Sequence, residues 1–357
     1  MSIDKIQQKV HSGRRLTRQD GIELFKSNDL LALGRMATHV AQRKNGNNVC
    51  FVRNMHINPT NICVNRCKFC AFSRSKGEPG AYEMSIEDIL NKARNATKGI
   101  REFHIVSGLH PDLPFSWYLE MLRSLKKEFP KIHLKAFTAV EIDYLSKISG
   151  LNLKDTLLEL KEAGLGSLPG GGAEIFNAAV RNTLCAEKIS GDRWLEVIET
   201  AHGIGMKSNA TMLYGHIERA EHRVDHLIKL RDLQDKTGGF QAFIPLSFHS
   251  QNTEIKKSAY TTGFDDLKTL AISRLMLDNF DHIKAYWVML GEKIAQVSLS
   301  FGVDDLDGTV VEERITKAAG GTTDGSMAKD DIVHLIQQAG RIPVERDTVY
   351  NILKVWH

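Results

Sequence analysis

Three of the five cysteines in this sequence, Cys63, Cys67 and Cys70, lie within eight residues of one another. The C-x3-C-x2-C spacing places three thiols on one short segment. An odd number of cysteines, in a long chain whose first residues lack the apolar core of a signal peptide, argues against a disulfide framework. Clustered thiols in a reducing compartment usually bind metal or perform redox chemistry. We therefore expect the chemistry of the protein at this segment.

Two kinds of metal centre suit three clustered thiols. Three thiolates can hold three irons of a 4Fe–4S cluster and leave the fourth iron open to a small molecule. A structural zinc site instead needs four ligands in a closed tetrahedron. His56 or His104 could supply the fourth ligand, but neither stands at a usual zinc spacing from the cysteines. The spacing favours the iron–sulfur cluster and leaves structural zinc as the alternative.

The cysteine segment directly follows a predicted strand, and the chain beyond it alternates between β-rich runs and amphipathic helical segments. We expect strands near residues 55–60, 103–107, 133–138, 166–168, 207–213, 240–247, 283–289 and 297–301. We expect helices near residues 86–98, 116–128, 153–163, 194–202, 220–235 and 265–279. Such alternation predicts right-handed βαβ units that close into a (β/α)8 barrel, with a doubly wound open sheet as the alternative. In a barrel the cysteine loop would lie at the C-terminal face, where active sites occur.

The segments on either side of the predicted barrel have helical patterns. We expect residues 1–50 to form N-terminal helices that pack on a barrel of residues 51–319. Residues 320–357 are predicted as a helical C-terminal extension, with helices at 330–338 and 343–353. The sequence shows no internal repeat and no linker between separate domains.

The composition is that of a globular protein, since 42% of the 357 residues are hydrophobic and 25% are charged. The formal charge of +4 comes from 47 basic and 43 acidic residues, which are spread along the chain. We therefore expect neither a nucleic-acid partner nor binding to a membrane surface. No stretch approaches about 18 consecutive apolar residues, so we expect no transmembrane helix and a cytoplasmic protein.

The cysteine spacing, the aromatic Phe69 before the last cysteine and the place of the loop after a strand together resemble the radical S-adenosylmethionine (SAM) superfamily. The resemblance covers nearly the whole chain. Four stretches are similar to its futalosine and deazaflavin branch, namely HINPTNICVNRCKFCAFSRSKGEPGAYEMS, SGLHPDLPFSWYLEML, SLPGGGAEIF and DLDGTVVEERI. Within the branch, residues 72–74 and 305–309 favour the member that makes 6-amino-6-deoxyfutalosine for menaquinone.

The resemblance implies a particular reaction. SAM would bind the open iron of a 4Fe–4S cluster, and one electron from a donor such as flavodoxin or ferredoxin would release methionine and a 5′-deoxyadenosyl radical. That radical would add to the vinyl carbon of 3-[(1-carboxyvinyl)oxy]benzoate, and rearrangement with loss of a carboxylate would give the product. The alternatives are the sister cyclic dehypoxanthinyl futalosine synthase, a deazaflavin (FO) synthase component and, outside enzymes, a non-catalytic zinc-binding module.

The resemblance also implies roles for residues around SAM, beginning with Cys63, Cys67 and Cys70 as cluster ligands. The expected SAM contacts are Phe69 near the adenine, Ser107 and Gly108 near the methionine ammonium, Thr138 and Glu141 near the nucleoside, Glu174 at the ribose or methionine and Arg181 near the methionine carboxylate. Simpler roles stay open, such as a strand-end turn at residues 107–108 and helix-start carboxylates at Glu141 and Glu174. The Gly170–Gly172 run, before a helix expected to reach Arg181, lacks the Gly-Lys-Ser/Thr of a phosphate loop.

Polar side chains on loops of the same face are candidates to bind the second substrate, whose carboxylates need charged or hydrogen-bonding partners once buried. These candidates are Arg74, His110, His249, Gln251 and Asn252. A lone loop histidine such as His110 is more often structural or solvated. Cys50 and Cys185 are expected to be free thiols.

Overall fold

Seven parallel strands form the central sheet of the molecule. The computed structural model describes residues 3–95, 99–255 and 261–356. In this sheet each strand pairs in parallel with the next one along the chain. The strands are β2 (Asn54–Ile57), β3 (Glu102–Ile105), β4 (His133–Ala136), β5 (Ser167–Leu168), β6 (Lys207–Tyr214), β7 (Phe240–Ser247) and β8 (His282–Ile283). Sequential parallel order is typical of a barrel, so the predicted α/β barrel class is confirmed and the doubly wound sheet is excluded.

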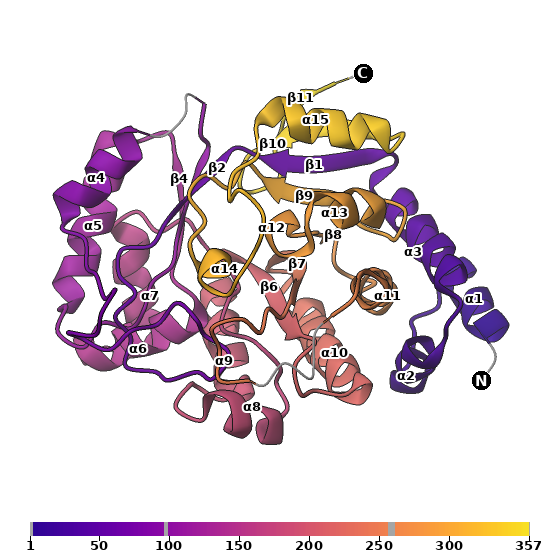
Figure 1. Cartoon of the computed structure of the whole chain (residues 1–357), viewed down its shortest axis with the longest axis horizontal. Coiled ribbons are helices and arrows are strands. Elements are labelled where there is room, and N and C mark those ends of the chain that lie inside the picture. Colours follow the sequence, from indigo (N-terminus) through magenta and orange to yellow (C-terminus); the bar gives the residue numbers. More distant parts are fainter. Residues whose placement is uncertain (1–2, 96–98, 256–260, 357) are drawn as a thin grey trace.

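Helices connect successive strands and surround them on the outside (Figure 1). They are α4 (Ile86–Arg94), α5 (Phe115–Glu128), α6 (Ala139–Ser149), α7 (Leu153–Glu162), α8 (Ala178–Cys185), α9 (Gly191–Gly203), α10 (Ala220–Thr237) and α11 (Gly263–Met276). The predicted helices agree with these bounds to within a few residues, except that the predicted end at 96–98 lies outside the described residues. Ser85 caps α4, since its Oγ accepts from the amide of Asp88 at 3.1 Å.

The eighth position of the barrel is filled by an irregular segment, residues 305–311, that begins with β9 (Asp305–Gly308). The amide of Ala285, just after β8, donates to the carbonyl of Asp305 at 2.9 Å. On the other side, the amide of His56 in β2 donates to the carbonyl of Val311 at 2.9 Å. The segment therefore lies between the first and last strands of the sheet and closes the barrel.

The eighth strand predicted at 297–301 is wrong. These residues lie at the end of α13 (Glu292–Ser298) and in the turn that follows. Their alternating apolar residues resemble a strand, but Ser298 and Leu299 are both fully buried next to each other, which a strand with two opposite faces does not explain. The predicted strand 283–289 is also shorter than expected, because α12 (Trp287–Leu290) begins within it.

A second, four-stranded sheet joins the two ends of the chain. Its order is β11 (Ile352–Val355), β10 (Ile342–Arg346), β1 (Asn48–Val52) and β9. The predicted helix at 343–353 is therefore wrong, because it covers most of β10 and the start of β11: β10 pairs in parallel with β1, almost 300 positions earlier, and β11 pairs antiparallel with β10. The helix α15 (Lys329–Gln338) contacts β9 and β10 of this sheet. The N-terminal helices are α1 (Ile3–His11), α2 (Arg18–Lys26) and α3 (Leu30–Asn45), of which α2 and α3 contact α11 of the barrel. The short helix α14 (Ile315–Ala318) lies between β9 and α15 in the chain. The division into residues 1–50, 51–319 and 320–357 stays a prediction.

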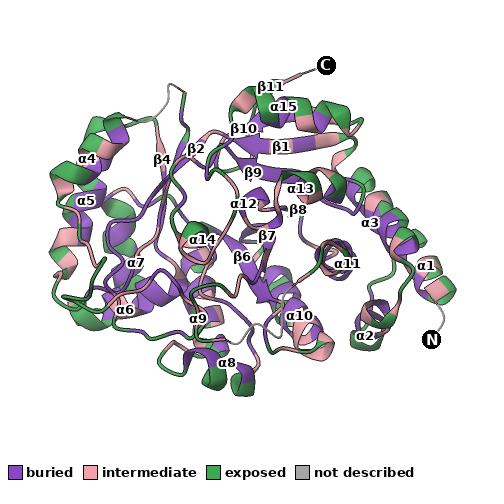
Figure 2. Ribbon diagram, in the orientation of Figure 1, coloured by how far each residue is buried: buried purple, intermediate pink, exposed green. Residues whose placement is uncertain are grey.

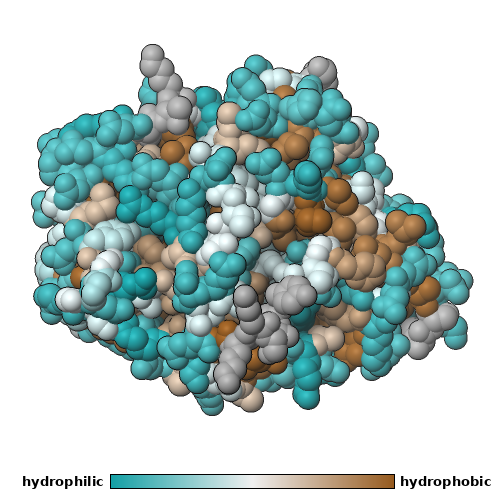
Figure 3. Space-filling view, viewed as in Figure 1, coloured by the Kyte–Doolittle hydropathy of each residue, from teal (hydrophilic) through white to brown (hydrophobic). Residues whose placement is uncertain are grey.

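Alternation along the strands separates an apolar layer from a polar interior. Met55 and Ile57 of β2, and Phe103 and Ile105 of β3, belong to the apolar core between strands and helices. The residues between them point to the opposite face, the inside of the barrel. Figure 2 shows buried strands inside and exposed outer helix faces, and Figure 3 shows hydrophilic side chains over α4 and α5. Among the described residues no helix combines the length and apolar character needed to span a bilayer.

Candidate active site

A cavity of about 340 Å³ lies at the C-terminal ends of the barrel strands. Residues from the cysteine loop, from the strand ends and from the barrel interior form its walls. Ten of the residues singled out in the sequence line it, namely Cys63, Cys67, Phe69, Cys70, Ser107, Gly108, Thr138, Glu141, Glu174 and His249. The structure thus brings the cysteines and most of the candidate SAM contacts together around one space, at the face where barrel enzymes have their sites.

Hydrogen bonds within the cysteine loop fix its course. The amide of Cys63 donates to the carbonyl of Arg74 at 3.0 Å, and the amide of Cys70 donates to the carbonyl of Cys67 at 2.9 Å. The guanidinium of Arg74 donates to the carbonyl of Ala71 at 2.9 Å. Arg74 does not line the cavity and instead ties the loop together. The three thiols are consequently held on one wall by a closed turn.

The loop after β3 packs directly against the cysteine loop. A Cβ atom on Gly108 would lie 2.3 Å from the carbonyl oxygen of Ile62, so only glycine allows this approach. Next to it, the amide and hydroxyl of Ser107 both donate to Oε1 of Glu141, at 3.0 and 3.1 Å. The other carboxylate oxygen accepts from the amide of Thr138 at 2.7 Å. One carboxyl group therefore connects the ends of β3 and β4.

Glu141 lies in the first turn of α6, with Thr138 as the N-cap, so it is the helix-start carboxylate that the sequence left open as its simpler role. The strand ends earlier, at Ala136. Burial raises the pKa of Glu141 to about 7, although hydrogen bonds from Thr138 and Ser107 act in the opposite direction. A buried carboxyl of this kind changes its charge near neutral pH.

Glu174 and Lys188 form an ion pair on the cysteine side of the cavity, with Oε1 and Nζ 2.7 Å apart. The ammonium of Lys188 also lies 5.1 Å from the centre of the Phe69 ring. Burial alone would lower the pKa of Lys188, but the neighbouring Cys67 and Glu174 together raise it above its usual value. Lys188 therefore stays a cation beside the cysteine loop, a place that was not expected from the sequence.

The glycine run before Glu174 forms a loop and does not open a helix, which corrects the expectation for this segment. The next helix, α8, begins only at Ala178, where the side chain of Asn177 caps it. Gly172 has a positive φ of 83°, and a Cβ atom there would lie 2.4 Å from Cγ2 of Val140. The glycines bring this loop close to the start of α6 and leave space in the cavity.

Besides Arg74, four of the candidate residues do not line the cavity. Arg181 is buried beside it, where its guanidinium donates to backbone carbonyls, including that of Ala173 at 2.6 Å. His110 is buried in its own loop, and its Nδ1 accepts from two backbone amides. Gln251 and Asn252 are exposed, and the amide group of Asn252 donates to a backbone carbonyl. Arg181, His110 and Asn252 thus make hydrogen bonds that hold the local backbone in place.

Several polar residues that were not expected to contact SAM or the second substrate line the strand side of the cavity, and two of them, His56 and His104, had been considered only as possible zinc ligands. These polar residues are His56, His104, Lys135, Asn209, Thr211, Lys284, Tyr286, Asp307 and Glu313. The signal was present, because polar residues alternate with apolar ones at 54–57, 102–105 and 133–136. In a barrel that alternation directs the polar side chains inward, whereas the substrate contacts were expected on loops.

Two ion pairs and two histidines dominate this strand side. Nζ of Lys135 lies 2.8 Å from Oε2 of Glu102, and Nζ of Lys284 lies 2.7 Å from Oδ1 of Asp307. Burial and the neighbouring His56 together lower the pKa of His104 to about 3. The histidines are therefore neutral at physiological pH, while the lysines have carboxylate partners.

The chain matches two family models, which follow one another along residues 57–357. Residues 57–230 match the radical SAM superfamily, and residues 237–357 match the CofH/MqnC C-terminal region. The match to the radical SAM model and the three cysteines on the wall of the barrel cavity together identify the family. The chain belongs to the radical SAM superfamily. Its cofactors are accordingly a 4Fe–4S cluster and SAM, and it is an enzyme.

Curated relatives resemble the chain over almost its whole length. The aminodeoxyfutalosine synthase of Thermus thermophilus is 47% identical over 98% of this chain and 96% of its own. The aminodeoxyfutalosine synthase of Streptomyces coelicolor is 47% identical over 98% of this chain and 94% of its own. A 5-amino-6-(D-ribitylamino)uracil–L-tyrosine 4-hydroxyphenyl transferase of Methanopyrus kandleri is 41% identical over 90% of this chain and 89% of its own.

Solved structures share the fold at low sequence identity. Methylornithine synthase (PylB) is similar with a TM-score of 0.74 and 18% identity, over 95% of this chain and 97% of its own. The FeFe-hydrogenase maturase HydG of Carboxydothermus hydrogenoformans has a TM-score of 0.75 and 18% identity, over 98% of this chain and 80% of its own. These structures confirm the architecture of the barrel.

The residues of the cavity fit the cofactors of this family. Three thiols line one wall, which is what a cluster with three protein ligands and one open iron needs. In the part of the chain that the structure describes, no three His, Cys, Asp or Glu side chains are arranged to hold a single metal ion. Burial raises the pKa of the Cys63 thiol, so loading the cluster must displace a proton there.

Proposed function

We propose that this chain makes 6-amino-6-deoxyfutalosine from SAM and 3-[(1-carboxyvinyl)oxy]benzoate, on the futalosine route to menaquinone. The observation that carries the proposal is the 47% identity with the aminodeoxyfutalosine synthase of Thermus thermophilus over 98% of the chain. The atoms balance when one water enters and methionine, hydrogencarbonate and a proton leave with the product. The adenosyl group is transferred to the substrate, so SAM is a co-substrate and the enzyme is a transferase.

On the cysteine side of the cavity, Cys63, Cys67 and Cys70 would hold the cluster and leave one iron for SAM. When bound, the cluster supplies the electron that cleaves the sulfonium of SAM into methionine and a 5′-deoxyadenosyl radical. Ser107 is held in place by Glu141, and Gly108 keeps the backbone close, so this turn is suited to receive the methionine ammonium.

The remaining polar residues of this side are proposed to surround the rest of SAM. Phe69, under the ammonium of Lys188, offers its ring to the adenine. Thr138 and Glu141 border the nucleoside, and Glu174 is placed to accept from ribose hydroxyls. Arg181 lies behind this wall and supports its loop through backbone carbonyls, so we propose an indirect role for it.

The electron would come from a partner such as flavodoxin or ferredoxin. Cys63 and Cys70 are only partly buried, which supports electron transfer to a cluster near the surface. We propose a cytoplasmic location for the enzyme, where SAM is made.

The test is an anaerobic incubation of the reconstituted enzyme with dithionite, SAM and 3-[(1-carboxyvinyl)oxy]benzoate, followed by mass spectrometry. The expected result is a product that contains the adenosyl group and has lost one carboxylate, formed together with methionine. Carboxyl-labelled substrate would release labelled hydrogencarbonate in equal amount. Formation of 5′-deoxyadenosine without an adduct would contradict the proposal and point to a sister substrate.

The second candidate is the condensation of tyrosine with 5-amino-6-(D-ribitylamino)uracil, because the 41% identical relative of Methanopyrus kandleri has that name. Tyrosine has one carboxylate and one ammonium, whereas the enol-ether substrate has two carboxylates. Two buried lysines on the strand side of the cavity favour the substrate with two carboxylates. The same anaerobic assay with tyrosine and the uracil separates the two candidates.

A further inference from the structure

A layer of polar side chains crosses the interior of the barrel below the cysteine loop. His56, His104 and Lys135 occupy matched positions on the neighbouring strands β2, β3 and β4. Lys284 follows β8, and Asp307 comes from the segment that closes the barrel. All five line the cavity that the cysteines also line. We call these five residues the inner polar layer.

The segment that closes the barrel places Asp307 in this layer by an unusual backbone course. Asp307 has a positive φ of 65°, and its amide donates to Oδ1 of Asp305 at 2.6 Å. The indole of Trp287 donates to the carbonyl of Gly308 at 2.9 Å. Non-glycine residues with positive φ persist where the surrounding structure holds them, often at functional sites. In this backbone conformation the carboxylate of Asp307 points toward Lys284.

The two lysines of the layer have donors to spare. The side chain of Lys135 is only 3% exposed, and that of Lys284 only 2%. An ammonium group has three N–H donors, and Glu102 or Asp307 is the one ionic partner that the structure records for each within the described residues. A buried cation that retains free donors next to a cavity is suited to a second anion.

The two histidines of the layer form a flat, neutral surface. The rings of His56 and His104 stack with centroids 4.4 Å apart and planes 12° apart. The Tyr286 ring is also nearly parallel to that of His56, with centroids 6.5 Å apart and planes 7° apart. The His104 side chain is about 21% exposed, so its ring faces the cavity. Aromatic rings pack favourably against such surfaces.

The geometry points to the inner polar layer as the binding site for an aryl substrate with two carboxylates: Lys135 and Lys284 each donate to one carboxylate, and His104 packs against the ring. The inference rests on the proposed function and deepens it, because it names the groups that receive the second substrate. Lys188 is on the cysteine side with Glu174, which leaves the inner lysines for the second substrate.

Binding can be measured without turnover. The probe is 3-(carboxymethoxy)benzoate, a saturated analogue with both carboxylates, titrated calorimetrically into the reconstituted enzyme with SAM. Phenoxyacetate and 3-methoxybenzoate, with one carboxylate each, are the comparison ligands. The wild type is expected to bind the dicarboxylate at least about tenfold more tightly than either monocarboxylate, since each anion contributes its own charge-assisted hydrogen bonds.

Paired variants keep the buried charge balanced, because a lone Lys→Met change would leave a buried carboxylate without its partner. We use K284M with D307N, and K135M with E102Q. Asparagine is among the residues that best tolerate positive φ at position 307. Each paired variant should lose about tenfold in affinity for the dicarboxylate and retain cluster absorbance and the KM for SAM. The control is K229M, since Lys229 is exposed and pairs with Asp192 on the surface.

Equal affinity of wild type and both paired variants for the dicarboxylate would overturn the inference, as would failure of the wild type to bind it. A raised KM for SAM with unchanged dicarboxylate binding would also overturn it, because the lysines would then serve the methionine carboxylate. The proposed function is tested by a different result. If the enzyme binds the dicarboxylate analogue but forms no adenosyl adduct, the binding site is supported and the proposed reaction is wrong.

Discussion

At the scale of single residues, the carboxyl group of Glu141 controls how two loops meet beside the cysteines. It accepts hydrogen bonds from Ser107 and from the amide of Thr138. Burial raises its pKa to about 7 from an ordinary value of 4.5. The folded protein therefore binds one more proton than the unfolded chain between these pH values. By linkage, the protonated carboxyl adds to the free energy of unfolding. This contribution is complete below the pKa that the group has in the unfolded chain, and it is lost as pH rises through the pKa that the group has in the folded protein.

The change E141Q tests this coupling. Between pH 4.5 and 7 the free energy of unfolding of the wild type should fall more than that of E141Q, because glutamine does not ionise. The difference between the two proteins should reach at most about 3 kcal/mol. Urea unfolding of both proteins under anaerobic conditions measures the difference. Parallel stability curves for the two proteins would show that Glu141 is not titrating in this range.

The change C67A tests the cysteine wall at the same scale. We expect loss of the cluster and of all SAM cleavage, because the two remaining thiolates hold the irons too weakly. Iron and sulfide content and the release of 5′-deoxyadenosine are the measurements. C50A is the matched control, since Cys50 is a free thiol in β1, outside the cavity. Full SAM cleavage by C67A would contradict the assignment.

At the scale of elements, the contact between the β3 loop and the cysteine loop depends on Gly108. A Cβ atom there would lie 2.3 Å from a backbone oxygen, which cannot move as a side chain can. We expect G108A to lose about 1–3 kcal/mol of stability and to reduce cluster content, because the cysteine loop must shift. Thermal unfolding and iron content measure both effects.

The control for this prediction is G203A at the end of α9, where a Cβ atom would meet nothing within 4 Å. Alanine there should be neutral or slightly stabilising, because it lowers the entropy of the unfolded chain. Equal cluster content in G108A and G203A would show that the loop contact does not position the cysteines.

The elements also show where sequence reasoning succeeds. Amphipathic helices with caps, such as α4 after Ser85, and the strands β3, β6 and β7 could be predicted, because their signals lie within a few residues. The segment 305–311 could not, since its role in closing the barrel depends on partners near residues 55 and 285. The same holds for β10, whose partner β1 lies almost 300 residues away.

The candidate site divides in the same way. The cysteines and the small residues at strand ends could be found from their spacing and from family resemblance. Lys135 and Lys284 were missed, and His104 was considered only as a possible zinc ligand, because these residues become site residues only when strands from distant parts of the chain face one interior. Arg74 and His110 were predicted for substrate, but the structure uses them to hold loops.

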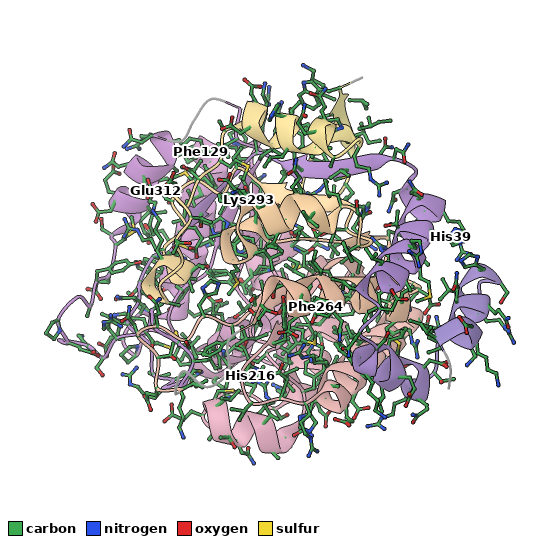
Figure 4. All side chains as sticks on the ribbon, turned by 45° about the vertical axis from the view of Figure 1, so that its right-hand side comes forward. His39, Phe129, His216, Phe264, Lys293 and Glu312 are labelled. Carbon is green, nitrogen blue, oxygen red and sulfur yellow. The ribbon has the colours of Figure 1, made fainter. Side chains whose placement is uncertain are left out.

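At the scale of the whole molecule, the C-terminal sheet supports the closure of the barrel. Arg346 in β10 pairs with Asp305, with Nη2 and Oδ2 2.6 Å apart, and both side chains are buried. The hydroxyl of Tyr350 donates to the same Oδ2 at 2.7 Å. Asp305 in turn accepts from the amide of Asp307, the partner of Lys284. Glu312, labelled in Figure 4, directly follows the closing segment, and its Oε2 lies 2.7 Å from Nζ of Lys92 in α4.

The change R346M should therefore act at a distance from the cysteines. It leaves Asp305 buried without its cation, which costs about 3–5 kcal/mol, and it loosens the segment that directs Asp307. We expect a lower Tm and a several-fold higher KM for the second substrate, with cluster content and the KM for SAM unchanged. R94M is the control, because its ion pairs on α4 are exposed and worth about 1 kcal/mol or less. If R346M lowered cluster content as much as substrate affinity, the C-terminal sheet would stabilise the barrel as a whole, and the specific route through Asp305 and Asp307 would be wrong.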